Sequence, residues 1–383
     1  MFKKKILRII PTLDKKYGGP VAAIIDSSLM LSKQGFKIDI LTNDLKNTNF
    51  YKSKKINIIN TGPAFGRYNF NIKLFIWLYL NRNKYDAFII HGLWQFHNFA
   101  ARVLLKKKYF VFTHGMLDPF FSGNFIKKTY KQIYWFFFEK KNLLNAKSIL
   151  LTSNGEKESL KKTFVNTEGI TKKVIRYGIN KPNVNKKKIT KKFYKKFPIL
   201  KYKKFYLFLG RYHEKKGCEI IIKSINKIKK NFKSIVFFAG PMLGGKYEIK
   251  IKNLVKKYEL QDKILFSDAL FGDLKWGAIN ASKAMVLSSH GENFGVSLVE
   301  SMSFGKPVIT TNKVNIANEI LKSKAGYVSK NKVNQYSNIL KKFENLKYRD
   351  IKKLSKNASS CFEKNFNISL GKNNLGYFLK KNI

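Results

Sequence analysis

The sequence predicts an α/β protein made of two doubly wound, Rossmann-like domains, and three observations support this fold class. Short apolar stretches alternate with amphipathic helical stretches from residue 5 to about residue 178. A lysine-rich segment at 181–204 interrupts the alternation, and the same alternation resumes at residue 205. Strands that alternate with helices form parallel sheets covered by helices on both faces.

The N-terminal domain is expected at residues 1–180, with seven short strands. Between the first two strands, residues 21–35 carry apolar side chains at helical spacing and end on Gly35, a typical helix terminus. Each strand-like stretch is short and rich in Ile, Leu, Val or Phe, as in a buried parallel sheet. The expected strands lie within 5–10, 36–42, 56–61, 87–92, 109–115, 148–153 and 172–178.

The segment 181–204 holds eleven lysines, two prolines and no acidic residue. We interpret it as a solvated linker with room for one short helix. The C-terminal domain then follows at residues 205–360, and the two domains are expected to face each other across a cleft. Ligands of open α/β sheets bind beyond the carboxyl ends of the strands, so functional residues should follow strands directly. The expected strands of this domain lie within 205–211, 234–240, 263–268, 284–289, 307–311 and 325–329.

The chain is strongly basic, with 76 Lys and Arg residues against 23 Asp and Glu residues and a net charge of +53. Only seven of the basic residues are arginine, and the lysines are scattered along the chain rather than gathered in blocks. Nucleic-acid-binding proteins concentrate arginine for phosphate and base contacts, so we do not expect a nucleic-acid partner. The positive field still attracts anionic ligands and anionic lipid surfaces.

The two cysteines, Cys218 and Cys361, lie far apart, which disfavours a disulfide framework and suits a reducing compartment. No apolar stretch is long enough for a membrane span, so we expect a cytoplasmic protein, with a peripheral position at the inner face of the plasma membrane as a further option. Residues 120–142 mix aromatic side chains with lysines at roughly helical spacing. Most of these aromatics suit a core, although some could form a surface that docks on anionic lipid.

Two motifs follow strands and suit phosphate groups. Gly18, Gly19 and Pro20 lead from the first strand into a helix, where glycine allows close backbone approach and the helix N-terminus attracts anions. A simple tight turn explains the same residues. Arg211 and Lys216 lie at the end of the stretch 205–211 and just after it, and two cations over one loop suit a diphosphate. A chance pair is the alternative in so basic a chain, although arginine is rare here.

Histidines are few, and none shows the spacing of a metal site. His114 ends the strand within 109–115 and heads a turn, so it is expected to face the cleft. There it could bind a substrate hydroxyl or stabilise developing charge, or it could simply cap the strand. His91 occupies the same place after the strand within 87–92 and is a weaker candidate.

Residues 290–311 contain two glutamates eight positions apart. Gly291 and Gly295 place Glu292 in a loop, and a helix is expected from about Val296 to Gly305. Glu300 then lies about one turn inside that helix, where a carboxylate also suits the helix dipole. Carboxylates on both sides of free backbone N–H groups suit a sugar nucleotide, because the N–H groups can bind phosphate while the carboxylates accept hydrogen bonds from hydroxyls.

Together these motifs resemble those of retaining glycosyltransferase family 4, a group with the GT-B fold. The resemblance covers nearly the whole chain and rests on residues 18–20, 114–119, 210–217 and 291–309. The Glu-x7-Glu pattern of the last segment is the specific one. One departure lies at 174–180, where Arg176 and Tyr177 replace the usual Pro-Asn and Asn180 replaces the acid, so that turn receives no role.

The resemblance implies residue roles. Arg211 and Lys216 would bind the donor diphosphate, and Glu300 would hold the ribose hydroxyls. Two catalytic residues are implied: Glu292 would contact the donor sugar, and His114 would lie near the transferred sugar. The remaining donor-binding positions implied by the family are Gly18 and Gly19 at the phosphates, Asp268 and Leu270 at the base, and Asn293, Phe294, Gly295 and Val296 beside the sugar.

The resemblance also implies an activity. A sugar would pass from a UDP- or GDP-sugar donor to a glycan or lipid-linked acceptor with retention, and the expected pathways are cell-surface polysaccharide, O-antigen or capsule synthesis. No cofactor and no obligatory metal would be needed, and the C-terminal helix at about 360–383 would complete the N-terminal domain. The alternatives are a sugar-nucleotide epimerase or phosphorylase of the same fold, and a non-catalytic basic protein that binds nucleic acid or membrane.

Overall fold

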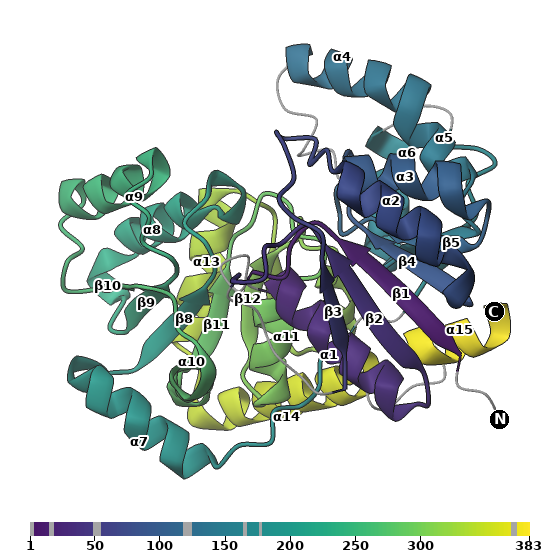
Figure 1. Ribbon diagram of the computed structural model, residues 1–383. Coiled ribbons are helices and arrows are strands. Elements are labelled where there is room, and N and C mark those ends of the chain that lie inside the picture. The colour runs from purple at the N-terminus through teal and green to yellow at the C-terminus, as the bar shows by residue number, and fades with distance from the viewer. Residues whose placement is uncertain are drawn as a thin grey trace. The chain divides into compact units, whose positions relative to one another are not determined.

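The computed structural model describes residues 4–14, 19–48, 55–117, 125–163, 167–175, 178–368 and 374–383. The chain forms two compact units (Figure 1). Unit 1 comprises residues 1–179 and 371–383, and unit 2 comprises residues 180–370. Gly18 lies outside the described residues, as do Asp118 and Pro119 of the turn after His114 and Arg176 and Tyr177.

Unit 1 is built on a parallel sheet of seven strands, in the order β3-β2-β1-β4-β5-β6-β7. The chain starts in the middle at β1, winds outward to β3 and then winds the other way from β4, which is the doubly wound arrangement expected. Most positions of the central strands are buried, as their apolar sequences require. The strands are β1 (Lys5–Ile10), β2 (Lys37–Thr42), β3 (Asn57–Asn60), β4 (Ala87–His91), β5 (Tyr109–Phe112), β6 (Ser148–Leu151) and β7 (Lys172–Val174).

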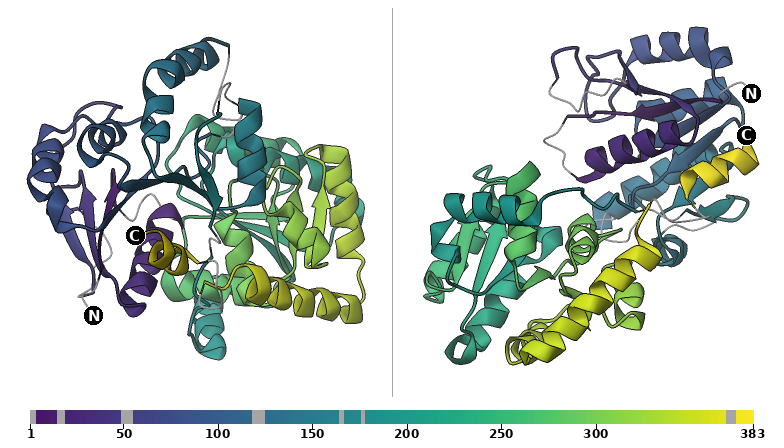
Figure 2. Two further views of the ribbon diagram at one scale, coloured as in Figure 1. Left: turned by 90° about the vertical axis from the view of Figure 1, so that its right-hand side faces the viewer. Right: turned by 90° about the horizontal axis from the view of Figure 1, so that it is seen from below.

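Helices cover this sheet. Helix α1 starts at Gly19, and α2 is capped by Asn71, whose side chain accepts a hydrogen bond from the N–H of Leu74. Helix α15 lies beside α1 in all three views (Figures 1 and 2). The helices are α1 (Gly19–Lys33), α2 (Ile72–Asn81), η2 (Arg82–Lys84), α3 (Phe96–Leu105), α4 (Phe125–Tyr134), the π-helix η4 (Trp135–Glu139), α5 (Lys140–Leu144), α6 (Asn154–Thr163) and α15 (Leu375–Asn382).

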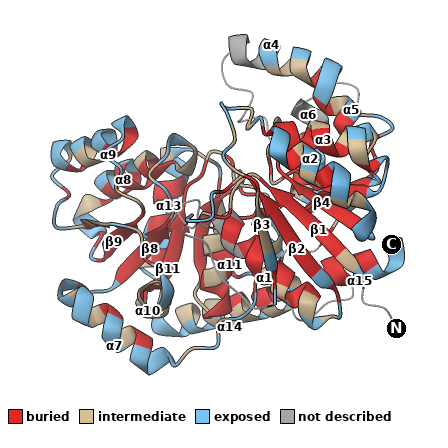
Figure 3. Ribbon diagram, viewed as in Figure 1, coloured by how far each residue is buried: buried red, intermediate tan, exposed pale blue. Residues whose placement is uncertain are grey.

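Unit 2 repeats the architecture with six parallel strands in the order β10-β9-β8-β11-β12-β13. Its central strands appear red in Figure 3, because both faces of the sheet are covered by helices, whereas the edge strands β10 and β13 are only partly buried. The strands are β8 (Phe205–Leu209), β9 (Ile235–Ala239), β10 (Ile264–Ser267), β11 (Ala284–Leu287), β12 (Val308–Thr311) and β13 (Gly326–Ser329).

The helices of unit 2 alternate with these strands, and α14 is the longest. They are α7 (Lys186–Lys196), η5 (Pro198–Leu200), η6 (Glu214–Lys216), α8 (Cys218–Lys227), η7 (Lys229–Asn231), α9 (Lys246–Lys257), α10 (Gly272–Ala281), α11 (Val296–Ser303), α12 (Ala317–Lys322), α13 (Val333–Glu344) and α14 (Tyr348–Asn365). No helix in the described part of the chain is both long enough and apolar enough to cross a bilayer.

The lysine-rich segment differs from the solvated linker that we expected at 181–204. It forms α7 and η5, and α7 packs against α10 as part of unit 2. Phe193 of α7 is fully buried and contacts the rings of Phe205 and Phe237. Two apolar positions four residues apart, Ile189 and Phe193, are buried, while most lysines around them stay exposed. The segment is therefore an amphipathic helix whose apolar side belongs to the core.

Candidate functional site

The candidate site of unit 2 lies in the loops that follow its strands. Arg211 follows β8 and is exposed, and Lys216 ends η6 in the same loop. Glu292 lies in the loop between β11 and α11, and Asp268 follows β10 directly. Parallel strands end at one edge of a sheet, so these residues gather at the carboxyl edge, as predicted.

Lys216 and Glu292 form an ion pair, although 76 residues separate them in the chain. Both side chains are about four-fifths buried. Burial alone would raise the pKa of Glu292, but the charge and the hydrogen bond of Lys216 outweigh it and hold that pKa below its ordinary value. Glu292 is therefore an ionised carboxylate at neutral pH.

Close backbone packing brings the two loops together. The hydroxyl of Ser288 donates to the carbonyl oxygen of Gly217 at 2.6 Å. Gly217 has φ +63°, and a Cβ atom at this position would lie 2.3 Å from the carbonyl oxygen of Ser288. Only glycine fits this position, because any side chain would push apart the two loops that carry Lys216 and Glu292.

The backbone of Glu292 is fixed on its other side by the loop after β12. Its N–H donates to the carbonyl oxygen of Lys313 at 3.0 Å, and its own carbonyl accepts from the N–H of Asn315 at 2.9 Å. The side-chain amide of Asn315 also donates to Asn293 at 3.3 Å. These bonds hold the loop that precedes α11.

Helix α11 begins at Val296, as expected, with Gly295 at φ +67° as its N-cap. Phe294 is buried and packs edge-to-face on Phe366. One turn into the helix, Glu300 accepts a hydrogen bond from the ammonium of Lys275 at 2.7 Å. Lys275 lies on α10, and nothing in the sequence pattern pointed to this partner. The N–H groups at the start of α11 thus lie between two carboxylates, each paired with a lysine.

Asp268 and Leu270 occupy the turn after β10. A carboxylate oxygen of Asp268 accepts from the N–H of Ala269 at 2.7 Å and from the N–H of Met242 at 3.2 Å. Leu270 is buried. Tyr212 lies under this turn, because its hydroxyl reaches the carbonyl oxygen of Ser267 at 2.8 Å. The carboxylate of Asp268 therefore stabilises the turn through these two hydrogen bonds, and the backbone of the turn lies at the edge of the candidate site.

A cluster that the sequence did not reveal lies beside Lys216. Nε2 of His290 is 3.1 Å from a carboxylate oxygen of Glu219, and the hydroxyl of Tyr247 donates to the other oxygen. The hydrogen bond with Glu219 raises the pKa of His290 above its ordinary value. Three separate elements, α8, α9 and the loop after β11, supply these side chains. No local pattern brings residues 219, 247 and 290 together, so only the fold shows them.

In unit 1, the predicted positions are Gly19 and His114. Gly19 is the first residue of α1, after β1, in agreement with a turn into a helix. His114 follows β5 with φ +48° and is partly exposed. Nδ1 of His91 is 2.9 Å from Nε2 of His114, so the weaker histidine candidate is the direct neighbour of the stronger one. Burial and the nearby charge of Arg8 lower the pKa of His114 to about 4.

Comparison with known proteins identifies the domain type. Residues 190–360 match the family described as glycosyl transferases group 1. Among curated proteins, the chain is 24% identical over 288 residues to alpha-1,3/1,6-mannosyltransferase ALG2 of Dictyostelium discoideum, covering 70% of this chain and 62% of the relative. It is 25% identical over 235 residues to O-antigen chain mannosyltransferase RfbU of Salmonella typhimurium, covering 61% and 60%. The matches thus span about three fifths of these relatives.

Solved structures show the same fold over the whole chain. Sucrose-phosphate synthase from Thermosynechococcus elongatus superposes with a TM-score of 0.77 and 16% identity, covering 99% of this chain and 98% of that one. Anabaena HepE in complex with UDP and glucose superposes with a TM-score of 0.74 and 13% identity, again covering 99% and 98%. The two parallel Rossmann-like sheets are those of the GT-B fold, which confirms the predicted fold class.

Proposed function

We propose that this chain, whose residues 190–360 match the glycosyl transferases group 1 family, is a glycosyltransferase that moves a sugar from a nucleotide-sugar donor to a glycan or lipid-linked acceptor with retention. The donor would be a UDP- or GDP-sugar, and the product would belong to cell-surface polysaccharide, O-antigen or capsule synthesis. The name of the Salmonella relative, an O-antigen chain mannosyltransferase, supports this direction.

The observation that carries the proposal is the pairing of Lys216 with Glu292 beside the N-terminus of α11. Lys216, together with the exposed Arg211, can neutralise a donor diphosphate, and the N–H groups of α11 add partial positive charge. Glu292 is ionised, so it accepts hydrogen bonds from sugar hydroxyls and stabilises positive charge that develops on the sugar. It does not supply a proton.

Glu300 is proposed to hold the ribose hydroxyls. Lys275 keeps its carboxylate oriented at 2.7 Å, and the side chain of Glu300 is about one-seventh exposed. An oriented carboxylate can accept two hydrogen bonds from vicinal hydroxyls. Asp268 and Leu270 would place the backbone against the base, and residues 293–296 would lie beside the sugar. Gly18 and Gly19 would approach the phosphates, and His114 would contact the transferred sugar.

Donor binding tests the proposal. UDP-glucose, UDP-N-acetylglucosamine and GDP-mannose serve as probes in thermal shift, because a ligand at 100 times its Kd stabilises by about 2.7 kcal/mol. Calorimetry then measures the affinity of the stabilising probe for the wild type and for Lys216→Ala and Glu300→Ala. We expect each variant to bind roughly 10- to 100-fold more weakly, as the loss of a charged hydrogen bond implies.

Lys192→Ala is the matched control, because Lys192 forms an exposed ion pair with Asp273 in the same unit. It should bind the donor as the wild type does. Unchanged donor affinity in both Lys216→Ala and Glu300→Ala would contradict the site assignment.

We also propose that unit 1 docks on an anionic membrane, where a lipid-linked acceptor would be found. The π-helix η4 exposes Phe136, Phe137 and Phe138 at 63, 54 and 46%, while its only acid, Glu139, is fully buried. Lys131 precedes this helix and Lys141 follows it. A surface with apolar and cationic side chains and no exposed acid suits an anionic interface.

Helix α2 of the same unit exposes a second apolar face. Ile72, Ile76 and Leu80 lie four residues apart, so they share one side of the helix, and each is more than half exposed. Sedimentation with phosphatidylglycerol vesicles tests both faces, with phosphatidylcholine vesicles for comparison. Leu80→Ser and Phe137→Ser should weaken binding to the anionic vesicles. Leu243→Ser, which removes an 84%-exposed leucine from unit 2, should not. Equal binding by all variants would contradict the docking surface.

A further inference from the structure

Unit 1 contains a row of hydrogen bonds that ends at His114. Nε of Arg8 donates to Nε2 of His91 at 3.0 Å, and Nδ1 of His91 lies 2.9 Å from Nε2 of His114. Arg8 and His91 are each 1% exposed. The rings of His91 and His114 are stacked, with centroids 5.2 Å apart. A buried cation is thus connected to the histidine that we place near the transferred sugar.

The sheet register brings these residues together. Arg8 of β1 lies opposite Ile89 of β4, and His91 is two residues beyond Ile89, on the same face. His91 lies opposite Phe112 at the end of β5, and His114 follows two residues later. Three neighbouring strands therefore contribute to one row at the carboxyl edge of the sheet.

Helix α1 fixes the guanidinium of Arg8. Nη1 donates to the carbonyl oxygen of Ile24 at 3.0 Å and to the hydroxyls of Ser27 and Ser28 at 2.8 and 2.7 Å. These contacts leave Nε aimed at His91. A third histidine, His97, donates from Nε2 to the carbonyl oxygen of His91 at 3.0 Å and holds the end of β4. The charged and titratable neighbours of His91 are thus Arg8, His97 and His114.

The proton positions follow from hydrogen-bond chemistry. A guanidinium only donates, so Nε2 of His91 accepts and carries no proton. Neutral His91 then has its proton on Nδ1 and donates it to Nε2 of His114. Neutral His114 must in turn carry its proton on Nδ1. Burial keeps both rings neutral, since it lowers the pKa of His91 well below its ordinary value and that of His114 to about 4.

We propose that Arg8 and His91 are positioning residues that fix His114 as a hydrogen-bond donor through Nδ1. The lone pair on Nε2 of His114 is occupied by His91, so His114 does not act as a general base. Nδ1–H is the group left to contact a ligand, and it suits a sugar hydroxyl oxygen or an oxygen that gains negative charge. This inference deepens the proposed function and rests on it for the identity of the ligand.

Nitrogen NMR of the protein labelled with 15N-histidine tests the proton positions without any donor. The chain has only five histidines, so single His→Gln variants assign the signals. We expect a protonated, pyrrole-type Nδ1 and an unprotonated, pyridine-type Nε2 for both His91 and His114 from about pH 6 to about pH 8. A pyrrole-type Nε2 on His114 in the wild type would overturn the proposal.

A pair of His91 variants tests whether the row sets the tautomer. The amide side chain of His91→Gln can still accept from Arg8 and donate to His114, whereas the apolar side chain of His91→Leu can do neither. We expect His114 to keep protonated Nδ1 in His91→Gln and to show a mixture of tautomers in His91→Leu. Circular dichroism establishes that each variant is folded. An unchanged His114 tautomer in folded His91→Leu would overturn the positioning role.

Arg8→Met removes the origin of the row and should also give mixed tautomers of His114. If that variant does not fold, the wild-type spectra and the His91 pair decide the question. The thermal-shift screen with nucleotide sugars is independent of these spectra. A wild-type protein that no probe stabilises would overturn the proposed function. The NMR measurement would still decide whether Arg8 and His91 set the tautomer of His114, because it needs no donor.

Discussion

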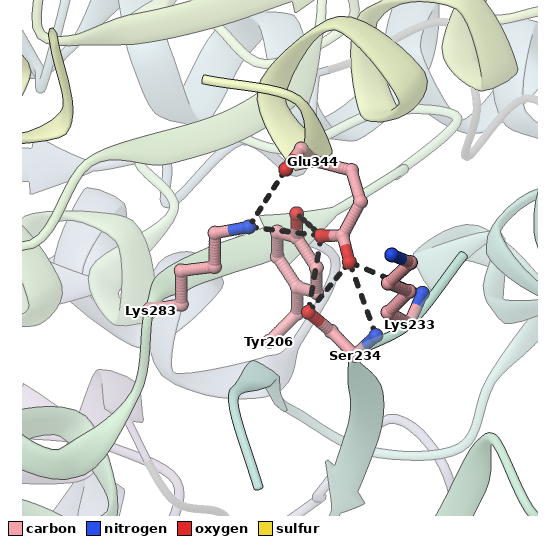
Figure 4. A network of polar contacts seen from close by, with 5 residues as sticks. All are labelled: Tyr206, Lys233, Ser234, Lys283 and Glu344. Atoms are coloured by element: carbon pink, nitrogen blue, oxygen red, sulfur yellow. Dashed lines mark hydrogen bonds and ion pairs between the residues drawn. The ribbon is translucent and has the colours of Figure 1, made fainter. Parts of the chain in front are cut away.

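The ammonium of Lys283 lies 2.9 Å from a carboxylate oxygen of Glu344, and both side chains are at least nine-tenths buried. Figure 4 shows that the same carboxylate is shared by side chains at or just before the starts of three strands of unit 2, β8, β9 and β11. The hydroxyl of Tyr206 donates to it at 2.5 Å and that of Ser234 at 2.8 Å. Glu344 ends α13, while its partners precede or begin strands, so this network ties a helix to the edge opposite the candidate site.

The first prediction concerns this network. Glu344→Ala leaves a buried ammonium and two buried hydroxyls without their acceptor, so it should lower the free energy of unfolding by about 3–5 kcal/mol. Urea unfolding measures this loss. Glu259→Ala is the control, because Glu259 forms an exposed pair with Lys229 and should cost less than about 1 kcal/mol. Equal losses in the two variants would contradict the structural role of Glu344.

The second prediction concerns how the stabilisation of the folded protein by Glu344 depends on pH. Burial acts to raise the pKa of Glu344, but the bonds from Tyr206 and Lys283 outweigh it and hold the pKa below its ordinary value. A lowered folded pKa means that the stabilisation is complete above the unfolded pKa, roughly 4.3, and is lost as pH falls through the folded value. The unfolding free-energy difference between wild type and Glu344→Gln should therefore shrink below about pH 4. A difference that grows on acidification would contradict this sign.

The third prediction uses two glycines with nearly the same backbone conformation. Gly217 and Gly244 have φ +63° and +67°, but a Cβ atom meets Ser288 only at Gly217 and meets nothing within 4 Å at Gly244. Gly244→Ala should cost about 1–2 kcal/mol, as expected for alanine in the left-handed region. Gly217→Ala should cost more and should also weaken donor binding, because it separates the loops of Lys216 and Glu292. Calorimetry with the stabilising probe and urea unfolding check both parts.

The fourth prediction concerns metal ions. Lys216, Arg211 and the N-terminus of α11 can together supply the positive charge that a leaving diphosphate needs. We therefore expect donor binding and transfer to be unchanged after extensive treatment with EDTA. Higher ionic strength, in contrast, should weaken donor binding, because Arg211 is exposed to solvent. Activity that disappears with EDTA and returns with Mg²⁺ would contradict this prediction.

Much of the fold could be predicted from local sequence patterns. In the described part of the chain, all thirteen strands lie within the expected ranges, because most of them are short apolar runs, as in a buried parallel sheet. Helix α11 begins at the expected residue, since glycines and the apolar period mark its start. A short helix was allowed within 181–204, but the packing of α7 into the core was not expected, because its many lysines suggested a solvated segment and only two buried positions, Ile189 and Phe193, indicated a core face.

The side-chain partners could not be predicted. Lys275 contacts Glu300 from a helix 25 residues earlier, and Glu219 contacts His290 across 71 residues. Arg8 reaches His91 across 83 residues. Local spacing carries no information on such contacts, which depend on strand order and on the register between neighbouring strands. The sequence indicated which residue types stand at the strand ends, while the fold determined which of them meet.

Helix α15 has a consequence for how the protein is made. It belongs to unit 1, where it packs against α1 and where Phe378 contacts Phe110 of β5 edge-to-face. Residues 375–382 leave the ribosome only after all of unit 2 has been synthesised. During translation, unit 1 therefore keeps the apolar surface that α15 covers exposed to solvent until the last residues are made. Unit 2 is one continuous segment and can fold before then. We expect cleavage or truncation before residue 374 to destabilise unit 1, although the missing residues are distant from most of that unit in the sequence.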